Sequence, residues 1–426
     1  MRTNFSPAQL CDPHIADAET NLRACVHCGI CTATCPTYVL LGDERDGPRG
    51  RIVMMQQMLE QGGAPTSETV HHIDRCLSCL GCRTACPSGV DYPRLIDTAR
   101  AHIEENYARP AGERALRWLI ANVLTRPSLS RAMLILAKVF APLSFLLPGR
   151  LRMMAAKGAA MRLGRAHVEK IETPANARRI ALMPGCVQKA LAPQIDDAVA
   201  RLLARRGFAL VPLASAGCCG SLVHHLGRED DAKAWARRAI EAFESAGGDK
   251  TFDAILITAT GCSSHLKDLA HLFAGDTHWQ NRAGAFASKV KDFSELATPR
   301  ALPPSRNLRV AYHAPCSLQH GLRLGGGNEA LLEAAGFEVL TIPEGHLCCG
   351  SAGSYSILQP DLADRLRARK LDNALSTKPD VIATANIGCL EHLSGPGAPP
   401  LVHVAELIDW AEGGPVPQAL HHIARK

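Results

Sequence analysis

Residues 25–36 read C-V-H-C-G-I-C-T-A-T-C-P, and residues 76–87 repeat the same spacing in C-L-S-C-L-G-C-R-T-A-C-P. Both stretches follow the pattern C-x2-C-x2-C-x3-C-P, which binds [4Fe-4S] clusters in bacterial ferredoxins. Three thiolates, one at every third position, curl a short loop around three corners of a cube, and the proline then turns the chain away. The doubled motif predicts two clusters close enough to pass single electrons between them.

The fourth cysteine of each motif is expected to serve the other cluster, as it does in two-cluster ferredoxins. The first predicted cluster is held by Cys25, Cys28, Cys31 and Cys86. The second is held by Cys76, Cys79, Cys82 and Cys35. A zinc site or a set of disulfides fits this pattern less well. Structural zinc sites use spaced pairs of ligands, and disulfide frameworks are typical of short secreted chains.

The composition indicates a folded soluble protein in a reducing compartment. Of its 426 residues 46% are hydrophobic and 21% are charged, which are ordinary proportions for globular domains. Seventeen cysteines occur without a recognisable secretory signal, which favours metal-bound or free thiols in the cytoplasm over disulfides. Sixteen of these cysteines fall into motifs, and Cys11 is left over as an ordinary thiol.

Positive charge is concentrated between Arg109 and Arg179, where fourteen Lys and Arg face three acidic residues, a local excess of eleven. The same stretch holds a 16-residue apolar run that Lys138 and Pro142 interrupt. That run is too short for a membrane span of about 20 residues. It predicts basic helices that either lie on an anionic membrane surface or pack their apolar faces on the rest of the protein. Nucleic acid is not an expected partner, because no recognised nucleic-acid motif accompanies the charge.

The C-terminal half of the chain contains an internal repeat. In both copies 31 residues separate the first cysteine from a Cys-Cys-Gly triplet. Short apolar runs alternate with helical stretches, which predicts β-α-β units and a parallel sheet in each copy. Each cysteine group follows an apolar run, and ligands gather at the carboxyl ends of parallel strands. Two sets of candidate ligands should therefore converge, Cys186, Cys218, Cys219, Cys262 and His265 in one copy and Cys316, Cys348, Cys349, Cys389 and His392 in the other.

The predicted fold class is a multidomain α+β protein. Residues 1–108 should form a mostly helical, ferredoxin-like domain for two [4Fe-4S] clusters, and residues 109–177 a basic helical connector. Residues 178–300 and 301–426 should form two repeated α/β cysteine-rich domains, each with a parallel sheet.

This layout resembles the iron–sulfur subunits that partner FAD-dependent hydroxyacid and glycerol-3-phosphate dehydrogenases. The run from Leu22 to Ile52, L-R-A-C-V-H-C-G-I-C-T-A-T-C-P-T-Y-V-L-L-G-D-E-R-D-G-P-R-G-R-I, is most similar to that of bacterial glycolate oxidase (glycolate dehydrogenase), and C-P-S-G-V-D-Y from Cys86 to Tyr92 agrees. The resemblance implies a partner subunit whose FAD oxidises glycolate to glyoxylate, a CH-OH donor. This chain would carry the electrons toward a quinone at the inner face of the cell membrane and would turn over no substrate by itself. It has no dinucleotide fingerprint, so the FAD is expected on the partner.

One departure from the family pattern concerns the end of each repeat. The family repeat ends C-x2-C, whereas this chain ends C-S-S-H at His265 and C-L-E-H at His392. Histidine ligates iron in Rieske centres, so a third centre at the repeats stays open, beside a pocket for quinone or partner and purely structural thiols.

Three other functions stay open from the sequence. The first is the equivalent subunit for D-lactate or glycerol 3-phosphate. The second is a thiol–disulfide subunit similar to heterodisulfide reductase, in which the Cys-Cys-Gly cysteines would do the chemistry. The last is a purely structural metal scaffold.

Overall fold

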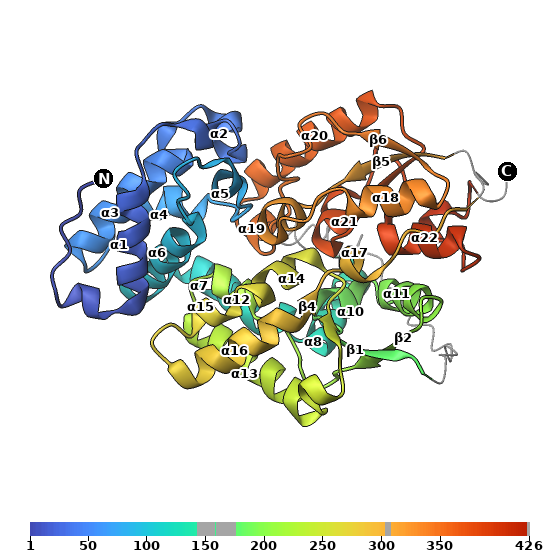
Figure 1. The fold of residues 1–426 in the computed structure, drawn as a ribbon. Helices are drawn as coiled ribbons and strands as arrows, with labels where there is room; N and C mark the ends of the chain where they lie inside the picture. Colours follow the sequence, from blue (N-terminus) through green and yellow to red (C-terminus); the bar gives the residue numbers. More distant parts are fainter. Residues whose placement is uncertain (143–157, 159–175, 303–307, 424–426) are drawn as a thin grey trace.

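A computed structural model describes residues 1–142, 158, 176–302 and 308–423 (Figure 1). The N-terminal helices form one lobe, coloured blue in Figure 1, beside two larger lobes that each contain a sheet. The two sheet-containing lobes are the two copies of the sequence repeat, and we call them the first and second repeat. This architecture confirms the predicted fold class. The predicted domain boundaries stay predictions.

The N-terminal lobe is helical because its apolar residues recur at helical spacing around a buried core. Its helices are η1 (Gln9–Cys11), α1 (Pro13–Ala24), η2 (Ile30–Thr32), α2 (Pro36–Leu41), η3 (Glu44–Asp46), α3 (Pro48–Gln61), α4 (Ser67–Asp74), α5 (Gly81–Ala85) and α6 (Tyr92–Asn106). Proline stands at the first position of α1, α2 and α3, where its missing N–H costs nothing. Leu22, Met55 and Ile96 are fully buried in the core that α1, α3 and α6 share.

The described part of the basic segment consists of three helical pieces, α7 (Ala111–Leu119), the π-helix η4 (Ile120–Leu124) and α8 (Pro127–Val139). Ion pairs join this segment to the N-terminal lobe. The guanidinium groups of Arg109 and Arg117 lie 2.6 Å and 3.0 Å from the Asp74 carboxylate. Ile120 packs into the core of the first repeat. Part of the segment therefore packs on the rest of the protein, which is one of the two arrangements predicted for it. Most of residues 143–177 lie outside the described residues.

Each repeat contains a four-stranded parallel sheet. The first sheet has the order β2-β1-β3-β4 and the second the order β6-β5-β7-β8, so the topology is the same in both copies. The strands are β1 (Arg178–Leu182), β2 (Phe208–Pro212), β3 (Ala254–Leu256), β4 (Val290–Lys291), β5 (Arg309–His313), β6 (Glu338–Thr341), β7 (Val381–Thr384) and β8 (Leu401–His403). Every cysteine group of the repeat lies shortly after the end of a strand, as predicted.

Helices flank both sheets. In the first repeat they are α10 (Val187–Leu191), α11 (Gln194–Ala204), α12 (Ser221–His225), α13 (Glu229–Ser245), η6 (Gly248–Lys250), α14 (Thr260–Lys267), α15 (Leu269–Leu272), α16 (Thr277–Lys289) and α17 (Phe293–Leu296). In the second they are η7 (Ser317–Leu322), α18 (Gly327–Ala334), α19 (Tyr355–Leu358), α20 (Pro360–Ser376), α21 (Ile387–Leu393), α22 (Val404–Ala411) and η8 (Gln418–Leu420). The last strand of each sheet leads into a helix with a capping box, Asp292 with Glu295 and His403 with Glu406.

The two repeats pack on each other through corresponding helices. Helix α11 of the first repeat contacts α22 of the second, and α18 of the second contacts α17 of the first, which is the pairing that a pseudo-twofold axis produces. Buried apolar residues of both sheets form one continuous core. The contact is reinforced by Asp409, which is 1% exposed and accepts hydrogen bonds from Arg201 and Arg205 at 2.6 Å and 2.5 Å. The repeats are thus held as one body with their strand ends fixed relative to each other.

Candidate metal centres

The two cysteine loops have the same backbone shape. His27 and Gly29 in the first loop are left-handed, with φ of 56° and 81°, and Ser78 and Leu80 occupy the equivalent positions with φ of 50° and 63°. Side chains other than glycine rarely adopt this conformation, which costs on the order of 1–3 kcal/mol per residue and persists where the surroundings impose it. Each loop therefore keeps an unfavourable backbone conformation. This conformation directs three cysteines of the motif toward one point.

The first set of predicted ligands converges at the surface of the N-terminal lobe. Cys25, Cys28, Cys31 and Cys86 line one small hollow, together with Cys82 of the second set. Burial raises the pKa of the Cys31 thiol to about 11, and the negative charge that Cys25, Cys86 and Cys28 would carry adds to that rise. Cys28 is exposed whereas Cys25 is buried, so one side of this set faces the surroundings.

The second set lies deeper and also draws its fourth cysteine from the other motif. Burial raises the pKa of Cys82 far above its usual value, with further contributions from Cys79, Cys76 and Cys35. The Arg51 guanidinium lies beside this set, with its Nη1 3.9 Å from the Cys35 sulfur. The fold thus brings Cys35 to the second loop and Cys86 to the first. The assignment of a cluster to each set stays a prediction.

The donor sets fit two cubane clusters. Each offers four thiols, three from one loop and one from the other, and the cubane takes four cysteine thiolates. Thiolate is the form of cysteine that binds a metal, so binding of the cluster would release the thiol protons. The residues present therefore suit the group that the motif implies.

The thiols of the first repeat also converge. The Cys218 sulfur lies 3.4 Å from that of Cys186, and Cys219 contacts both Cys218 and Cys262. His265 lies within electrostatic reach of Cys218. Burial lowers the pKa of His265 to about 4, so its ring is neutral, and its Nε2 has no hydrogen-bond partner in the described part of the chain.

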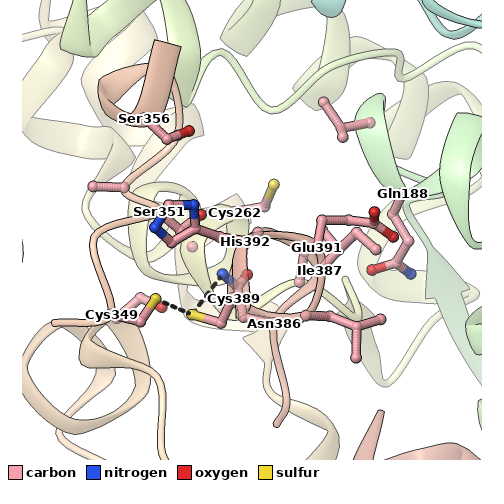
Figure 2. A pocket seen from close by; sticks show the side chains of 18 of the residues that line it. Gln188, Cys262, Cys349, Ser351, Ser356, Asn386, Ile387, Cys389, Glu391 and His392 are labelled. Atoms are coloured by element: carbon pink, nitrogen blue, oxygen red, sulfur yellow. Dashed lines mark hydrogen bonds between the residues drawn. The ribbon is translucent and has the colours of Figure 1, made fainter. Parts of the chain in front are cut away.

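In the second repeat the four thiols are also connected, because Cys348 contacts both Cys316 and Cys349. Cys316 and Cys348 are 3.8 Å apart, and Cys349 and Cys389 are 3.3 Å apart, the latter pair being visible in Figure 2. His392 is directed elsewhere, because its Nε2 lies 3.1 Å from the backbone carbonyl of Ala363 in α20. The two predicted histidines therefore differ. His392 is bonded to the backbone of a neighbouring helix, whereas the Nε2 of His265 is left without such a bond.

A cavity of about 1770 Å³ lies between the two repeats and the N-terminal lobe. Cysteines of both repeats line it, namely Cys186, Cys219, Cys262, Cys316, Cys348, Cys349 and Cys389. The hydroxyls of Thr260 and Ser317, one from each repeat, are 2.8 Å apart. The cysteine groups of the two repeats therefore share one chamber.

The second cysteine loop abuts the second repeat. Thr84 forms a hydrogen bond of 2.8 Å with His320 of η7, and Figure 1 shows α5 beside this repeat. Cys79 is close enough to Cys316 and Cys348 for their charges to affect one another. The deeper of the two candidate cluster sites is therefore the one that adjoins the thiols of the second repeat.

Sequence reasoning missed several residues that shape these sites. Arg100 donates hydrogen bonds of 2.6 Å to the Cys76 carbonyl and to the Ser78 hydroxyl, and so fixes the second loop. Arg51 and Asp46 form a buried pair behind Cys35. Both residues lie within the run that carries the family resemblance. Charged residues are normally exposed to solvent, and no periodic pattern in the sequence indicates that these two are buried.

Comparisons with known proteins agree with this arrangement. A family model described as a 4Fe-4S dicluster domain matches residues 21–90. A model described as a cysteine-rich domain, of the CCG type, matches twice, over residues 180–267 and 310–394. These matches define the class, an iron–sulfur protein with a dicluster domain and a duplicated cysteine-rich domain.

Two relatives narrow the class. The chain is 38% identical to the glycolate oxidase iron-sulfur subunit of Escherichia coli (strain K12), over 96% of this chain and 99% of that protein. It is 30% identical to the probable glycolate oxidase iron-sulfur subunit of Bacillus subtilis (strain 168), over 93% of this chain and 95% of that one. The chain belongs to the family of glycolate oxidase iron–sulfur subunits, as the resemblance predicted.

Two other similarities are weaker. Lactate utilization protein A of Exiguobacterium is 27% identical over 54% of this chain and 96% of its own length. The crystal structure of a hypothetical protein from Helicobacter pylori covers 96% of this chain and 74% of its own with a TM-score of 0.55 at 8% identity. At that identity the likeness concerns the fold alone.

Proposed function

We propose that this chain is the electron-transfer subunit of an FAD-linked glycolate dehydrogenase. The observation that carries the proposal is the pair of four-thiol sets, each completed by a cysteine of the other motif. A bound [4Fe-4S] cluster supplies reversible uptake of one electron. The chain's own residues hold the two sets next to each other, and three of the four cysteines of the second set are buried, namely Cys35, Cys76 and Cys82. Substrate chemistry would belong to the flavin of a partner subunit, because the organic step is the work of the cofactor.

The surface position of the first set favours electron entry there. Val26 and Ile30 flank its cysteines and are 68% and 53% exposed, although both are apolar. Exposed apolar side chains beside an exposed ligand, Cys28, suit a contact with a partner protein. The FAD-binding subunit would dock on this side, and electrons would move inward to the second set, which adjoins Cys316. The acceptor beyond it would be a quinone.

A lactate-oxidising complex is the second candidate. Its support is the similarity to lactate utilization protein A over about half of the chain. The same path for electrons would serve either hydroxyacid, because substrate choice would lie in the flavin subunit. Comparing glycolate with D-lactate and glycerol 3-phosphate as reductants of the purified complex distinguishes these possibilities.

We further propose that the complex is cytoplasmic and attaches to the inner face of the membrane through α7, η4 and α8. No described helix is long and apolar enough to span a bilayer. Several large apolar side chains of the segment are nonetheless exposed, namely Trp118, Leu129, Ile135, Leu136, Val139 and Phe140. Arg126, Arg131 and Lys138 lie on the same stretch. Near an anionic surface each such cation contributes on the order of 1 kcal/mol.

Attachment predicts that raised salt weakens binding of the complex to anionic vesicles, because salt screens exposed charges. Changing Trp118, Leu136 and Phe140 to Ser should weaken binding at ordinary salt as well. The matched control changes Leu10 and Leu375, which are exposed elsewhere, to Ser. Vesicle sedimentation measures both. Equal binding by the two sets of variants would contradict the membrane contact.

Iron counting tests the two-cluster proposal and the exchange of ligands together. The anaerobically purified chain should contain about eight iron and eight sulfide in its dicluster domain. Cys28→Ser combined with Cys86→Ser should lose about four iron, because both residues serve one cluster. Cys28→Ser combined with Cys35→Ser should lose about eight, because the residues serve different clusters. The reverse order of the two double variants would show that each motif keeps its own fourth cysteine.

A further inference from the structure

Two buried tyrosines beside the second set of thiols have hydroxyl groups that the fold leaves without a hydrogen bond. Tyr92 is the first residue of α6 and is 3% exposed. Tyr355 is the first residue of α19 and is 5% exposed. Neither hydroxyl oxygen has a hydrogen-bond partner within the described residues. Tyrosine hydroxyls usually find a partner when they are buried, so each of these two needs an acceptor.

Tyr92 lies between the two sets of candidate cluster ligands. Its side chain belongs to the same buried core as Cys76 and Cys82 of the second set, and it also lines the hollow of the first set. The thiols whose charges act most on its hydroxyl are those of Cys76, Cys82 and Cys35, which all belong to the second set. The ring therefore borders both sets, whereas the hydroxyl is nearest to the second.

Tyr355 approaches the second set from another lobe. Helix α19 belongs to the second repeat and lies on the side that faces the N-terminal lobe (Figure 1). Tyr355 packs in one buried cluster with Leu77 of the second loop and Cys348 of the repeat, and Cys79 packs against that cluster. Its hydroxyl is within electrostatic reach of Cys76. One free hydroxyl from each lobe thus lies at the second set.

We propose that Tyr92 and Tyr355 donate hydrogen bonds to sulfur atoms of a [4Fe-4S] cluster at the second set and so raise its reduction potential above that of the first cluster. The inference rests on the proposed function, because it requires both clusters. Hydrogen bonds to the sulfurs and solvent exposure are among the features that set the potential of such a cluster. A donor stabilises the reduced form more than the oxidised form, because the reduced form carries one more negative charge.

Both hydroxyls remain protonated and can donate. Burial raises the pKa of Tyr92 and of Tyr355 well above the usual value for a phenol. The redox change is the transfer of one electron from the first cluster to the second. No covalent bond breaks in it, and each tyrosine keeps its proton. The two side chains are therefore positioning residues that tune the second cluster and carry no charge themselves.

Arg51 adds positive charge at the same set. Its side chain is 1% exposed, and its charge acts on both Cys76 and Cys35. Asp46 contacts Arg51 at 3.4 Å and Arg75 at 2.8 Å, so one carboxylate faces two guanidinium groups. The excess of positive charge favours the reduced form of a cluster at the second set, in the same direction as the two hydroxyls.

The first set has more open surroundings. Cys28 is exposed, and Arg49, which lines the hollow of this set, is 36% exposed and pairs with Glu44 at 2.6 Å. Solvent and a paired carboxylate both weaken the effect of such a cation. The reduced form should therefore be more stable at the second set than at the first, which gives the inward direction of electron flow a physical cause.

EPR-monitored redox titration of the full chain, purified anaerobically, tests the proposal. Tyr92→Phe and Tyr355→Phe each remove one hydroxyl and keep the ring. Each should lower the higher of the two cluster potentials, because the equilibrium constant for reduction falls on the order of tenfold, which is about 59 mV for one electron. The double variant should lower this potential further. The iron content and the lower potential should stay at their wild-type values.

Tyr312→Phe is the matched control. Tyr312 is 6% exposed, and its hydroxyl already accepts a hydrogen bond of 3.0 Å from Asn328 in the second repeat. This variant should leave both potentials unchanged. Replacing the tyrosines of the wild-type chain by fluorotyrosine, whose more acidic hydroxyl is a stronger donor, provides a measurement that removes no group. It should shift the higher potential upward.

The outcomes separate this inference from the proposed function. Two clusters whose potentials stay unchanged in both Phe variants and in the fluorotyrosine protein would overturn the inference alone. A shift confined to the lower potential would do the same. A wild-type chain that holds fewer than two [4Fe-4S] clusters would overturn the inference together with the proposed function.

Discussion

Cys79→Ala is expected to abolish delivery of electrons from the complex to a quinone or dye. Cys79 belongs to the deeper set of thiols and lies next to Cys316 of the second repeat. Its loss removes a direct ligand, so activity should fall by more than the roughly 10–100-fold that loss of an outer-shell partner costs. Glycolate should still reduce the flavin of the partner subunit. Steady-state dye reduction and anaerobic flavin bleaching measure the two steps separately.

Cys11→Ala is the matched control for that variant. Cys11 is exposed and belongs to no motif, so its removal should leave both steps unchanged. Dye reduction by Cys79→Ala at the wild-type rate would contradict a path through the second set. Loss of flavin bleaching in an assembled Cys79→Ala complex would also contradict it, because substrate oxidation is assigned to the other subunit.

The second large effect is expected from Asp46→Asn. Asp46 is fully buried and contacts three groups, Arg51 at 3.4 Å, His72 at 3.0 Å and Arg75 at 2.8 Å. Removing its charge leaves the Arg51 guanidinium, which is 1% exposed, without its anion. Breaking a buried pair in this way costs about 3–5 kcal/mol. The urea midpoint of the anaerobic protein should fall markedly, and the second cluster should become labile because Arg51 lies behind Cys35.

Glu68→Gln provides the comparison for Asp46→Asn. Glu68 pairs with Arg45 at 2.7 Å, but both side chains are more than half exposed. Water screens such a pair, which therefore contributes little to stability. The two variants remove one carboxylate each from the same lobe and differ in burial. Equal effects on the urea midpoint would show that the buried network does not stabilise the lobe.

Much of the fold could be predicted from the sequence because its signals are local. The cysteine spacing identifies the two loops, and apolar runs followed by helical stretches identify three strands of each sheet. The fourth strands, β4 and β8, are two and three residues long. Strands so short carry no alternation of apolar and polar residues, and they exist because a neighbouring strand pairs with them.

The candidate sites were predictable from the sequence where their ligands lie close together in the chain. The Cys-Cys-Gly triplets can be recognised from the sequence alone. His313 can be recognised as a neighbour of Cys349 and Cys389 only in the fold, where β5 brings it to them. Arg51 and Asp46 are five residues apart, yet the sequence does not show that both are buried. One difference between the two copies of the repeat is visible in the sequence. The first copy has Met183 three residues before its first cysteine, and the second copy has His313 at the equivalent position.

We propose above that this chain takes electrons from a flavin subunit into clusters held by its two four-thiol sets. Rapid-freeze EPR of the anaerobic complex after one addition of glycolate tests it directly. Signals of two interacting [4Fe-4S] clusters should grow as the flavin is reduced and reoxidised within one turnover. Flavin that becomes reduced while the clusters of an active, fully loaded complex stay oxidised would contradict it.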